Sequence, residues 1–422
     1  MKKFTIIGMA LCLAFALAAP VMAVDADFSG HYRVKGFYTS HWDLRETSAS
    51  NAYMDMQFRL QTVFKVNDIL SVTTRFDALD DEVWGDDPNG DEGAIDFDRA
   101  YMTIKAPVGM FVIGRMLGGP LGNDFTDFEY EGDRIIFITK IDALKVVAIF
   151  QKNTEGDSTD LTSADKDRDD YFLVGIYNAE DITAGLGFFF TNDKRKDNET
   201  SRFYILNPYF NTKFGPLALQ GEVFYKWGKT EFDPIAAGGT GDPDLDKDAI
   251  AYNLEASYNL GMASVMAGYA FFSGDNDGAT DNENNEFEYG VGDNWRRLFI
   301  LTSDEDPVLC ENLGGGAGNL STTGRNTQYG AKIFYGGASV TPMENLQLGL
   351  VVGLADNDEV PSGWEDDIGV EYDLTLNWKI YDNLTYSAIA AYLDAGDAWQ
   401  LGNKSIDIEN TYALFHQLEL AF

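Results

Sequence analysis

The stretch "YMDMQFRLQTVFKV", residues 53–66, alternates apolar and polar side chains almost without interruption. One side carries Met54, Met56, Phe58, Leu60, Phe64 and Val66, and the other carries Asp55, Gln57, Arg59, Gln61 and Lys65. Successive side chains of a strand point to opposite faces, so the pattern predicts a β-strand with one apolar and one polar face. The apolar face would meet a second sheet in a soluble sandwich, or lipid in a membrane barrel.

The same alternation recurs along the chain, for example in "DIGVEYDLTLNWKI" at 367–380 and "AIAYNLEASYNL" at 249–260. Counting such segments gives about 18 strands, with 16 as the alternative count, and "WRRLFILT" near 295 as an uncertain extra strand. We predict strands near 27–39, 53–66, 69–79, 96–105, 110–116, 133–140, 145–151, 170–178, 183–192, 201–212, 216–228, 248–259, 262–273, 327–341, 345–355, 367–380, 383–395 and 409–422.

The connections between these strands alternate between tight turns and long acidic loops. Tight turns include "APVG" at 106 and "YDN" at 381, whereas long loops include "DDEVWGDDPNGDEG" from 80 and the stretch 274–326. Outer-membrane barrels have short periplasmic turns and long external loops. The chain is therefore predicted to be all-β, a single transmembrane antiparallel β-barrel, with 274–326 as a long external loop.

The chain's ends and charge fit this class. Lys2 and Lys3 precede an apolar run, which predicts a secretory signal peptide at 1–23 and a barrel at 24–422. The net charge of −37 disfavours nucleic acid as a partner. After cleavage Cys310 is the remaining thiol, which excludes an intramolecular disulfide, while pairing with another subunit stays open.

Two motifs resemble Gram-negative outer-membrane porins. The last strand, "NTYALFHQLELAF", ends on Phe422, like the terminal assembly signal of these barrels, although His416 stands where an apolar residue is usual. "FDRAYMTIKAPVGMFVIGRM", at 97–116, resembles a porin hairpin. The resemblance implies an outer-membrane location, a homotrimer, and contacts with outer-membrane lipid, lipopolysaccharide and the barrel-assembly machinery. It also implies that the third loop, 117–133, folds inward and constricts the pore.

Strand parity then predicts which charged side chains face the lumen. The expected basic wall, from the first five strands, consists of Arg33, Lys35, Arg59, Lys65, Arg75, Arg99 and Arg115. Across the pore we expect the constriction-loop acids Asp124, Asp127 and Glu129. Other predicted lumen acids are Glu222, Glu255, Glu371, Asp373 and Glu419. Opposite charges across a narrow pore would orient water and favour small polar solutes; the alternative is that these charges merely solvate the lumen.

Metal and catalytic chemistry find weak support in the sequence. Asp242, Asp244 and Asp246 are spaced like the start of a calcium loop, but Lys247 stands where glycine is needed. We therefore predict no cofactor beyond loosely bound divalent cations such as calcium. His31, His41 and His416 are placed apart, and the "SADK" at 163 lies in an acidic loop, so we predict no enzyme activity.

The sequence thus predicts a porin for passive diffusion of ions and small hydrophilic solutes, with little ion selectivity, because acidic external loops and a basic constriction oppose each other. Two alternatives remain open. A sugar-selective channel would need a line of lumen aromatic residues, for which Phe37, Tyr101, Phe224 and Phe415 are scattered candidates. A structural sheath would hold a partner such as an electron-carrying protein.

Overall fold

The computed structural model describes residues 24–85, 95–118, 122–127, 130–156, 166–234, 241–276, 281–309 and 328–422. The predicted signal peptide, Glu129 and Cys310 lie outside these residues.

The first half of the chain forms β1 Asp25–Thr39, β2 Asn51–Lys65, β3 Leu70–Val83, β4 Ile95–Ala106, β5 Gly109–Leu117, η1 Asp124–Thr126, β6 Glu131–Ile141, β7 Leu144–Thr154, β8 Arg168–Ala179 and β9 Ile182–Asp193. The second half forms β10 Glu199–Phe214, β11 Leu217–Phe232, β12 Leu245–Asn259, β13 Ala263–Phe272, β14 Glu283–Asn284, β15 Ala331–Met343, β16 Leu346–Asp356, β17 Asp367–Tyr381, β18 Leu384–Ala395, η3 Asp397–Gln400 and β19 Thr411–Ala421.

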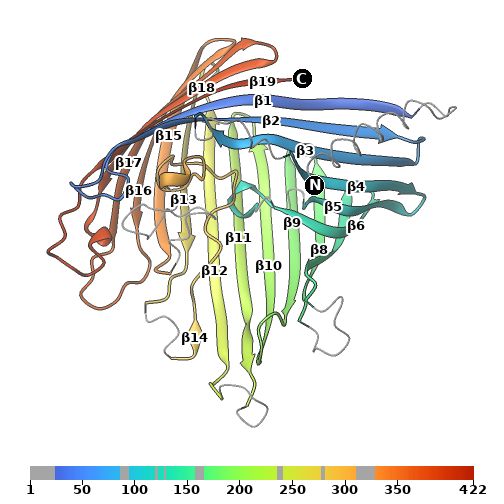
Figure 1. The fold of residues 1–422 in the computed structure, drawn as a ribbon, viewed down its shortest axis with the longest axis horizontal. Helices are drawn as coiled ribbons and strands as arrows, with labels where there is room; N and C mark the ends of the chain where they lie inside the picture. The colour runs from blue at the N-terminus through green and yellow to red at the C-terminus, as the bar shows by residue number, and fades with distance from the viewer. Residues whose placement is uncertain are drawn as a thin grey trace.

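The sheet closes on itself. Each wall strand pairs antiparallel with the next, and β1 pairs with β19, from His31 opposite Ala421 to Thr39 opposite Ala413. Figure 1 shows the red β19 beside the blue β1. β14 is a two-residue strand that runs parallel to β12 and adds no wall strand. The wall is therefore a closed barrel of 18 antiparallel strands, as predicted.

Burial in this barrel is inverted relative to a soluble protein. On β17, Glu371 is 0% and Asp373 3% exposed, whereas their neighbours Tyr372 and Leu374 are 45% and 60% exposed. β2 shows the same order, with Asp55 and Gln57 buried. The apolar face therefore points outward and the polar face inward, which is how a barrel meets hydrocarbon around an interior polar surface. This confirms the prediction that the apolar face of 53–66 is the outer one.

Closure of the barrel also gives the backbone N–H and C=O groups of β1 and β19 hydrogen-bond partners. Lipid offers no hydrogen-bond partners, so every strand needs two neighbours within the hydrocarbon layer. Phe422 exchanges two backbone hydrogen bonds with Gly30, at 2.9 and 3.0 Å, next to the paired length of β1 and β19. Its ring stacks on Phe58 of β2, with 6.2 Å between the ring centroids. No helix in the described part of the chain is long and apolar enough to cross a membrane.

β3 departs from the prediction in a way that matters for the interior. The sequence places Asp80 onward in an external loop, but β3 continues to Val83. Its register against β2 shifts between Met56 and Phe58, so that residues 79–81 bulge from the ladder. Leu79 and Asp81 adopt positive φ of 57° and 51°, which non-glycine residues seldom do.

Candidate functional site: the barrel interior

The described residues 122–127 of the third loop lie against the inner side of β10 and β11. Asn123 Nδ2 donates to the backbone carbonyls of Phe210 and Gly221, both at 3.1 Å, on β10 and β11. The Asn123 backbone N–H donates to Glu222 Oε2 at 3.1 Å, and the Thr126 hydroxyl donates to the same carboxylate. Phe125 is buried, 5.1 Å from the ring of Phe272 on β13. The inner surface of β10–β13 thus holds η1 in place.

A second segment enters the interior from the long connection between β13 and β15. Its described residues 285–309 carry the apolar side chains Phe287, Val291, Trp295, Leu298, Ile300, Leu301 and Leu309, all at most 1% exposed. Trp295 packs against Phe125 and against Tyr335 of β15, each with 5.4 Å between ring centroids. Residues 122–127 and 285–309 therefore share one apolar core, and we call them together the plug.

Glu371 and Asp373 of β17 hold the plug by its backbone. The N–H of Phe299 donates to Asp373 Oδ2 at 2.9 Å. The N–H groups of Ile300 and Leu301 donate to the two Glu371 oxygens at 2.5 and 2.9 Å. Three consecutive backbone N–H groups therefore find their acceptors on two neighbouring, buried carboxyl groups.

The two plug segments also interlock through Gly292. Its N–H donates to Phe125 O at 2.8 Å, and the next N–H, of Asp293, donates to Asp127 O at 3.2 Å. A Cβ on Gly292 would stand 2.4 Å from Asp124 O and 2.7 Å from Asp127 N. The absence of a side chain at this residue therefore allows the close approach of the two loops.

Charged side chains tie the plug to the wall on both sides. Glu288 pairs with Lys226 of β11 and with Lys247 of β12, the latter at 2.6 Å. Arg297 bonds Glu255 of β12 at 2.7 Å.

Opposite these contacts, the plug meets the first two strands. Glu305 lies 3.4 Å from the Lys35 amine. Asp306 accepts hydrogen bonds from Thr39 at 2.7 Å and from Tyr53 at 3.3 Å. The plug thus contacts strands from β10 around to β2.

The Glu288 carboxyl is held ionised by its two lysine partners. Burial by itself would raise its pKa, but the charges and hydrogen bonds of Lys226 and Lys247 outweigh burial and lower the pKa to about 2. Tyr289 lies beside it, with its hydroxyl 3.1 Å from the Lys226 amine. This tie therefore persists at physiological pH.

These contacts correct two sequence predictions. The stretch 274–326 was expected to be an external loop, but its described residues 285–309 lie against lumen-facing side chains of the wall. Residues 295–302, considered as an extra strand, form part of the plug and contain no strand. Alternation failed as a guide here because an apolar run also suits a segment buried among inward side chains.

The remaining basic wall is an array of ion pairs. Arg59 binds Asp77, with Nε to Oδ1 at 2.7 Å. Arg75 bonds Asp98 and Glu131, the latter at 2.7 Å, and Glu131 also lies 3.1 Å from Arg99. Towards β1, the bulged Asp81 lies 3.2 Å from both Arg33 and Lys35. We call this set the ion-pair wall: Arg33, Lys35, Arg59, Arg75, Arg99, Asp77, Asp81, Asp98 and Glu131.

Two members predicted for the basic wall lie elsewhere. Arg115 is paired across the ladder with the exposed Ala100 on β4 and with Asp133 on β6. The side chains of Arg115 and Asp133 are both at least half exposed on the outer face. The prediction that Arg115 lines the lumen is wrong, because the inward parity of β5 belongs to Val112, Gly114 and Met116. Lys65 pairs with Asp27 near the short-turn end of β2, away from the other basic residues.

Arg134 is the interior arginine that the sequence analysis missed. It is 5% exposed and donates to Gln151 Oε1 at 2.7 Å, to Met116 O at 2.5 Å and to Tyr130 O at 3.1 Å. In the structure Arg134 lies opposite Gly114 and shares its inward face. In the sequence, the stretch "RIIFIT" is apolar on both faces, so alternation does not mark Arg134 as an inward residue.

The predicted constriction acids also have different partners from those expected. Asp124 lies 3.8 Å from Arg297 of the plug. Asp127 contributes its backbone carbonyl to the interlock with Asp293. Glu131, at the start of β6, is the acid that meets Arg75 and Arg99. The loop's hydrogen bonds join it to β10 and β11, and the prediction that its acids face the arginines across the pore stays a prediction.

The other predicted acids divide between the plug and the strand ends. Glu222, Glu255, Glu371 and Asp373 all face inward and bind plug residues, whereas Glu419 lies opposite Arg33 and accepts from Gln417. Asp244 bonds Lys229 at 3.1 Å. Asp246 is paired with Lys229 in the ladder between β11 and β12, and the described residues contain no group of three His, Cys, Asp or Glu side chains placed to hold a metal.

Three of the four aromatic candidates for a sugar path, Phe37, Phe224 and Phe415, face the interior but are covered. Phe37 stacks on Tyr53, with centroids 4.7 Å apart. Phe415 packs on Phe299 at 5.5 Å, and Phe224 on Phe287 at 5.4 Å. Phe37, Phe224 and Phe415 are each at most 6% exposed. They belong to the packing between plug and wall, and do not form an open aromatic line.

A match to a family model decides the class. The model described as "Gram-negative porin" matches residues 9–388, which is most of the chain. The chain belongs to the Gram-negative porin family. It is an outer-membrane β-barrel that forms a channel for passive diffusion, as the sequence analysis predicted. A search of curated protein sequences finds no match.

Solved structures with the same fold agree with this porin over nearly its whole length. Acinetobacter baumannii OccAB1 is 14% identical, with a TM-score of 0.57, covering 96% of this chain and 99% of the other. Pseudomonas aeruginosa OccK9 (OpdG) is 16% identical, with a TM-score of 0.56 and coverages of 94% and 99%. At such identities the likeness extends to the fold and not to the solutes.

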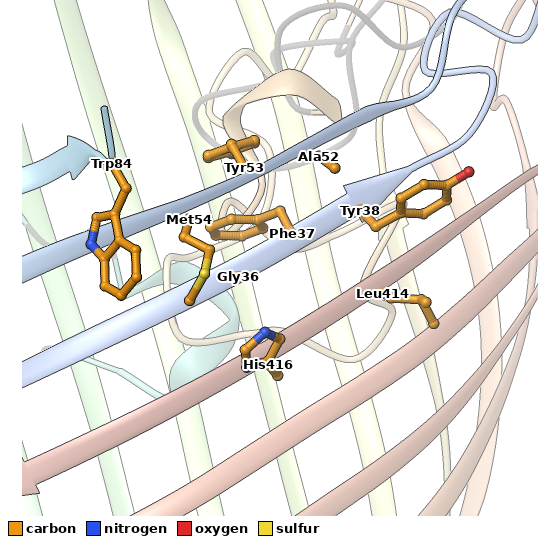
Figure 2. A pocket seen from close by; sticks show the side chains of 9 residues that line it. All are labelled: Gly36, Phe37, Tyr38, Ala52, Tyr53, Met54, Trp84, Leu414 and His416. Atoms are coloured by element: carbon orange, nitrogen blue, oxygen red, sulfur yellow. The ribbon is translucent and has the colours of Figure 1, made fainter. Parts of the chain in front are cut away.

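The outer surface of the porin has a hollow of about 490 Å³ over β1, β2 and β19 (Figure 2). It forms where Gly36 has no side chain: the His416 ring lies over this glycine, and Met54 and Trp84 flank it. His416 therefore faces outward, as predicted from parity. Phe37 and Tyr53, which face the interior, lie behind the strands at the floor of this hollow.

Proposed function

We propose that this porin conducts its solutes along the ion-pair wall, past the plug. The observation that carries the proposal is the exposure of charged side chains inside the barrel. Asp81 is 56% exposed, Arg59 28% and Arg33 21%, although all three belong to the inner surface. Water reaches these groups, whereas Glu371 and Asp373 of β17, which bind the plug, are 0% and 3% exposed.

The ion pairs explain which solutes fit such a path. A wall of alternating donors and acceptors can replace the hydrogen bonds that a hydrophilic solute gives up when it leaves bulk water. Apolar solutes would displace that water without replacing its hydrogen bonds. Because each arginine has a carboxylate partner, the field of the wall is local, and no uniform basic surface faces the solute.

Planar-bilayer recording of the purified protein tests this function. We expect discrete conductance steps in potassium chloride, and uptake of small sugars into swelling proteoliposomes without saturation. Saturable uptake of one sugar would instead support the substrate-selective alternative. A folded barrel without conductance would overturn the proposal and favour the sheath, although a partner protein would then have to displace the chain's own plug.

We further infer a homotrimer whose contact includes the hollow around Gly36. A histidine facing hydrocarbon is costly, and a neighbouring subunit over His416 would remove it from lipid. A copy of the chain offers exposed aromatic side chains such as Trp84, 51% exposed, to fill the hollow. The rest of the outer surface would face lipid and lipopolysaccharide, with Phe422 read by the assembly machinery.

Substitution in the hollow tests the trimer. Met54→Arg should convert the purified porin from trimer to monomer in detergent, as measured by light scattering, and conductance should then appear in single steps. The matched control is Leu350→Arg, on the outer face of β16, which should leave the trimer intact. A wild-type monomer in detergent and in native membranes would overturn the inferred trimer without affecting the channel.

A further inference from the structure

Glu371 and Asp373 of β17 are two neighbouring carboxyl groups that are buried without a cation. Both side chains are at most 3% exposed. On the same face of β17, and opposite the pair on β16 and β18, lie residues without titratable side chains: Gly369, Thr375, Gly353, Val351, Leu393 and Ala391. The plug adds the backbone N–H groups of residues 299–301 and the Leu298 side chain, which lies over Gly353. Within the part of the chain that the structure describes, neither carboxyl group has a Lys, Arg or His partner.

The hydrogen bonds of this pair leave one oxygen atom without a donor. Both Glu371 oxygens and Asp373 Oδ2 accept from the plug backbone, whereas Asp373 Oδ1 is buried and receives no N–H or O–H of the protein. The two carboxyl groups nonetheless lie within hydrogen-bonding contact of each other. Two ionised carboxylates have no proton to donate and repel each other, so such a contact requires that one of them keeps its proton.

We propose that Glu371 and Asp373 form a proton-binding site that holds the plug in place. One proton, on a Glu371 oxygen, is the missing donor to Asp373 Oδ1, and with it every polar atom of the pair has a hydrogen-bond partner. No third His, Cys, Asp or Glu side chain among the described residues joins the pair, which favours a proton over a metal ion as the occupant.

The shared proton links the position of the plug to pH. With the plug in place the pair is buried, and it binds one proton more than it would if the plug moved away and water reached both carboxyl groups. Falling pH favours the state that binds more protons, so rising pH should favour the displaced plug. One proton per displacement changes the ratio of the two states by at most about tenfold per pH unit.

Bilayer recordings between pH 6 and pH 9 test this link, and this readout rests on the proposed function because a displaced plug must widen a conducting path. The wild type should enter a larger conductance state more often as the pH rises. Asp373→Asn keeps an acceptor for Phe299 and places an amide N–H beside Glu371 at every pH, so it should abolish the pH dependence. Glu419→Gln is the matched control, because its carboxylate bonds Gln417, and it should behave like the wild type.

A pH dependence that persists in Asp373→Asn would overturn the proposal. It would show that another tie of the plug titrates, such as that of Glu288 with Lys226 and Lys247. A wild-type conductance that is constant over this range would also overturn the link to pH.

Infrared spectroscopy detects the proton without any conducting channel. The difference spectrum between wild type and Asp373→Asn at pH 7 should contain the C=O stretch of a protonated carboxyl group, and that between wild type and Glu419→Gln should lack it. Absence of this band would overturn the proton-binding site, whereas the band in a silent barrel would preserve the site and overturn the proposed function. If Asp373→Asn does not fold, Glu371→Gln decides, because its amide N–H also replaces the shared proton.

Discussion

The two halves of the interior use the same kinds of side chain in opposite ways. Along the plug-contacting strands, the inward acids Glu222, Glu255, Glu371 and Asp373 bind loop atoms, and they are lost to solutes. Along the ion-pair wall, inward charges bind one another across neighbouring strands and stay within reach of water. Inward parity thus identifies a polar surface but does not say whether it holds a loop or lines a path.

Removal of the plug should have the largest effect, because it would make the inward side chains along β10–β17 as open to water as those of the ion-pair wall. Replacement of residues 285–309 by a short Gly-Ser linker should leave the barrel closed, since its strand pairing does not pass through the plug. We expect single-channel conductance to rise severalfold because the interior along β10–β17 becomes open to water. Conductance equal to that of the wild type would mean that the plug lies outside the conducting path.

Weakening the plug's attachment should give the next largest effect. Glu371→Gln with Asp373→Asn replaces the two carboxyl groups that accept the three backbone hydrogen bonds, each worth about 0.5–1.5 kcal/mol. We expect frequent transitions to a larger conductance in bilayer recordings. Glu419→Gln is the control, as its carboxylate bonds Gln417 and not the plug, and steady currents from the double variant would contradict this role.

Arg134, which faces the interior, and Arg115, which faces outward, should differ in their contribution to the free energy of unfolding. Arg134→Ala removes a buried guanidinium that serves three acceptors, and it should lower the free energy of unfolding by about 1–3 kcal/mol per acceptor left unsatisfied. Arg115→Ala, on the outer face, should change it by less than about 0.5 kcal/mol. Urea titration in detergent measures both, and the reverse order would show that the face assignment of β5 is wrong.

The contact between the two plug segments should be sensitive to a single side chain. Gly292→Val places a Cβ against Asp124 O and Asp127 N, an overlap expected to cost about 1–3 kcal/mol. The result should be a noisier open channel with an unchanged barrel melting temperature. Gly175→Ala serves as control, since its Cβ meets only Leu144 at 3.8 Å. Identical noise in both variants would argue against the interlock.

The pH dependence of the Glu288 tie should be the smallest effect. The pKa of its carboxyl is lowered to about 2 in the folded chain from 4.5, so its stabilisation is complete above the unfolded value and is lost only as the pH falls toward 2. The stability difference between wild type and Glu288→Gln should therefore be constant from pH 7 to 5. A difference that declines in this range would show that the two lysines do not hold the carboxyl.

Much of the wall could be predicted because each strand carries its own evidence. Lipid outside and polar surface inside impose alternation on every strand, and the turns between strands show which end is which. The predicted and observed strands therefore agree closely, from Asp25–Thr39 to Thr411–Ala421. The exceptions have local causes: the bulge at 79–81 adds residues that parity does not count, and the inward apolar side chains of β6 and β7, such as Ile136 and Ile149, hide the alternation.

By itself the sequence determined the closed barrel, its outward face and the family to which it belongs, since these follow from patterns of neighbouring residues. Only the tertiary structure decided what fills the barrel. The plug forms because Phe299, Ile300 and Leu301 reach Asp373 and Glu371 from some 70 positions away in the chain. Such contacts depend on the path of a loop through three-dimensional space, for which strand periodicity carries no signal.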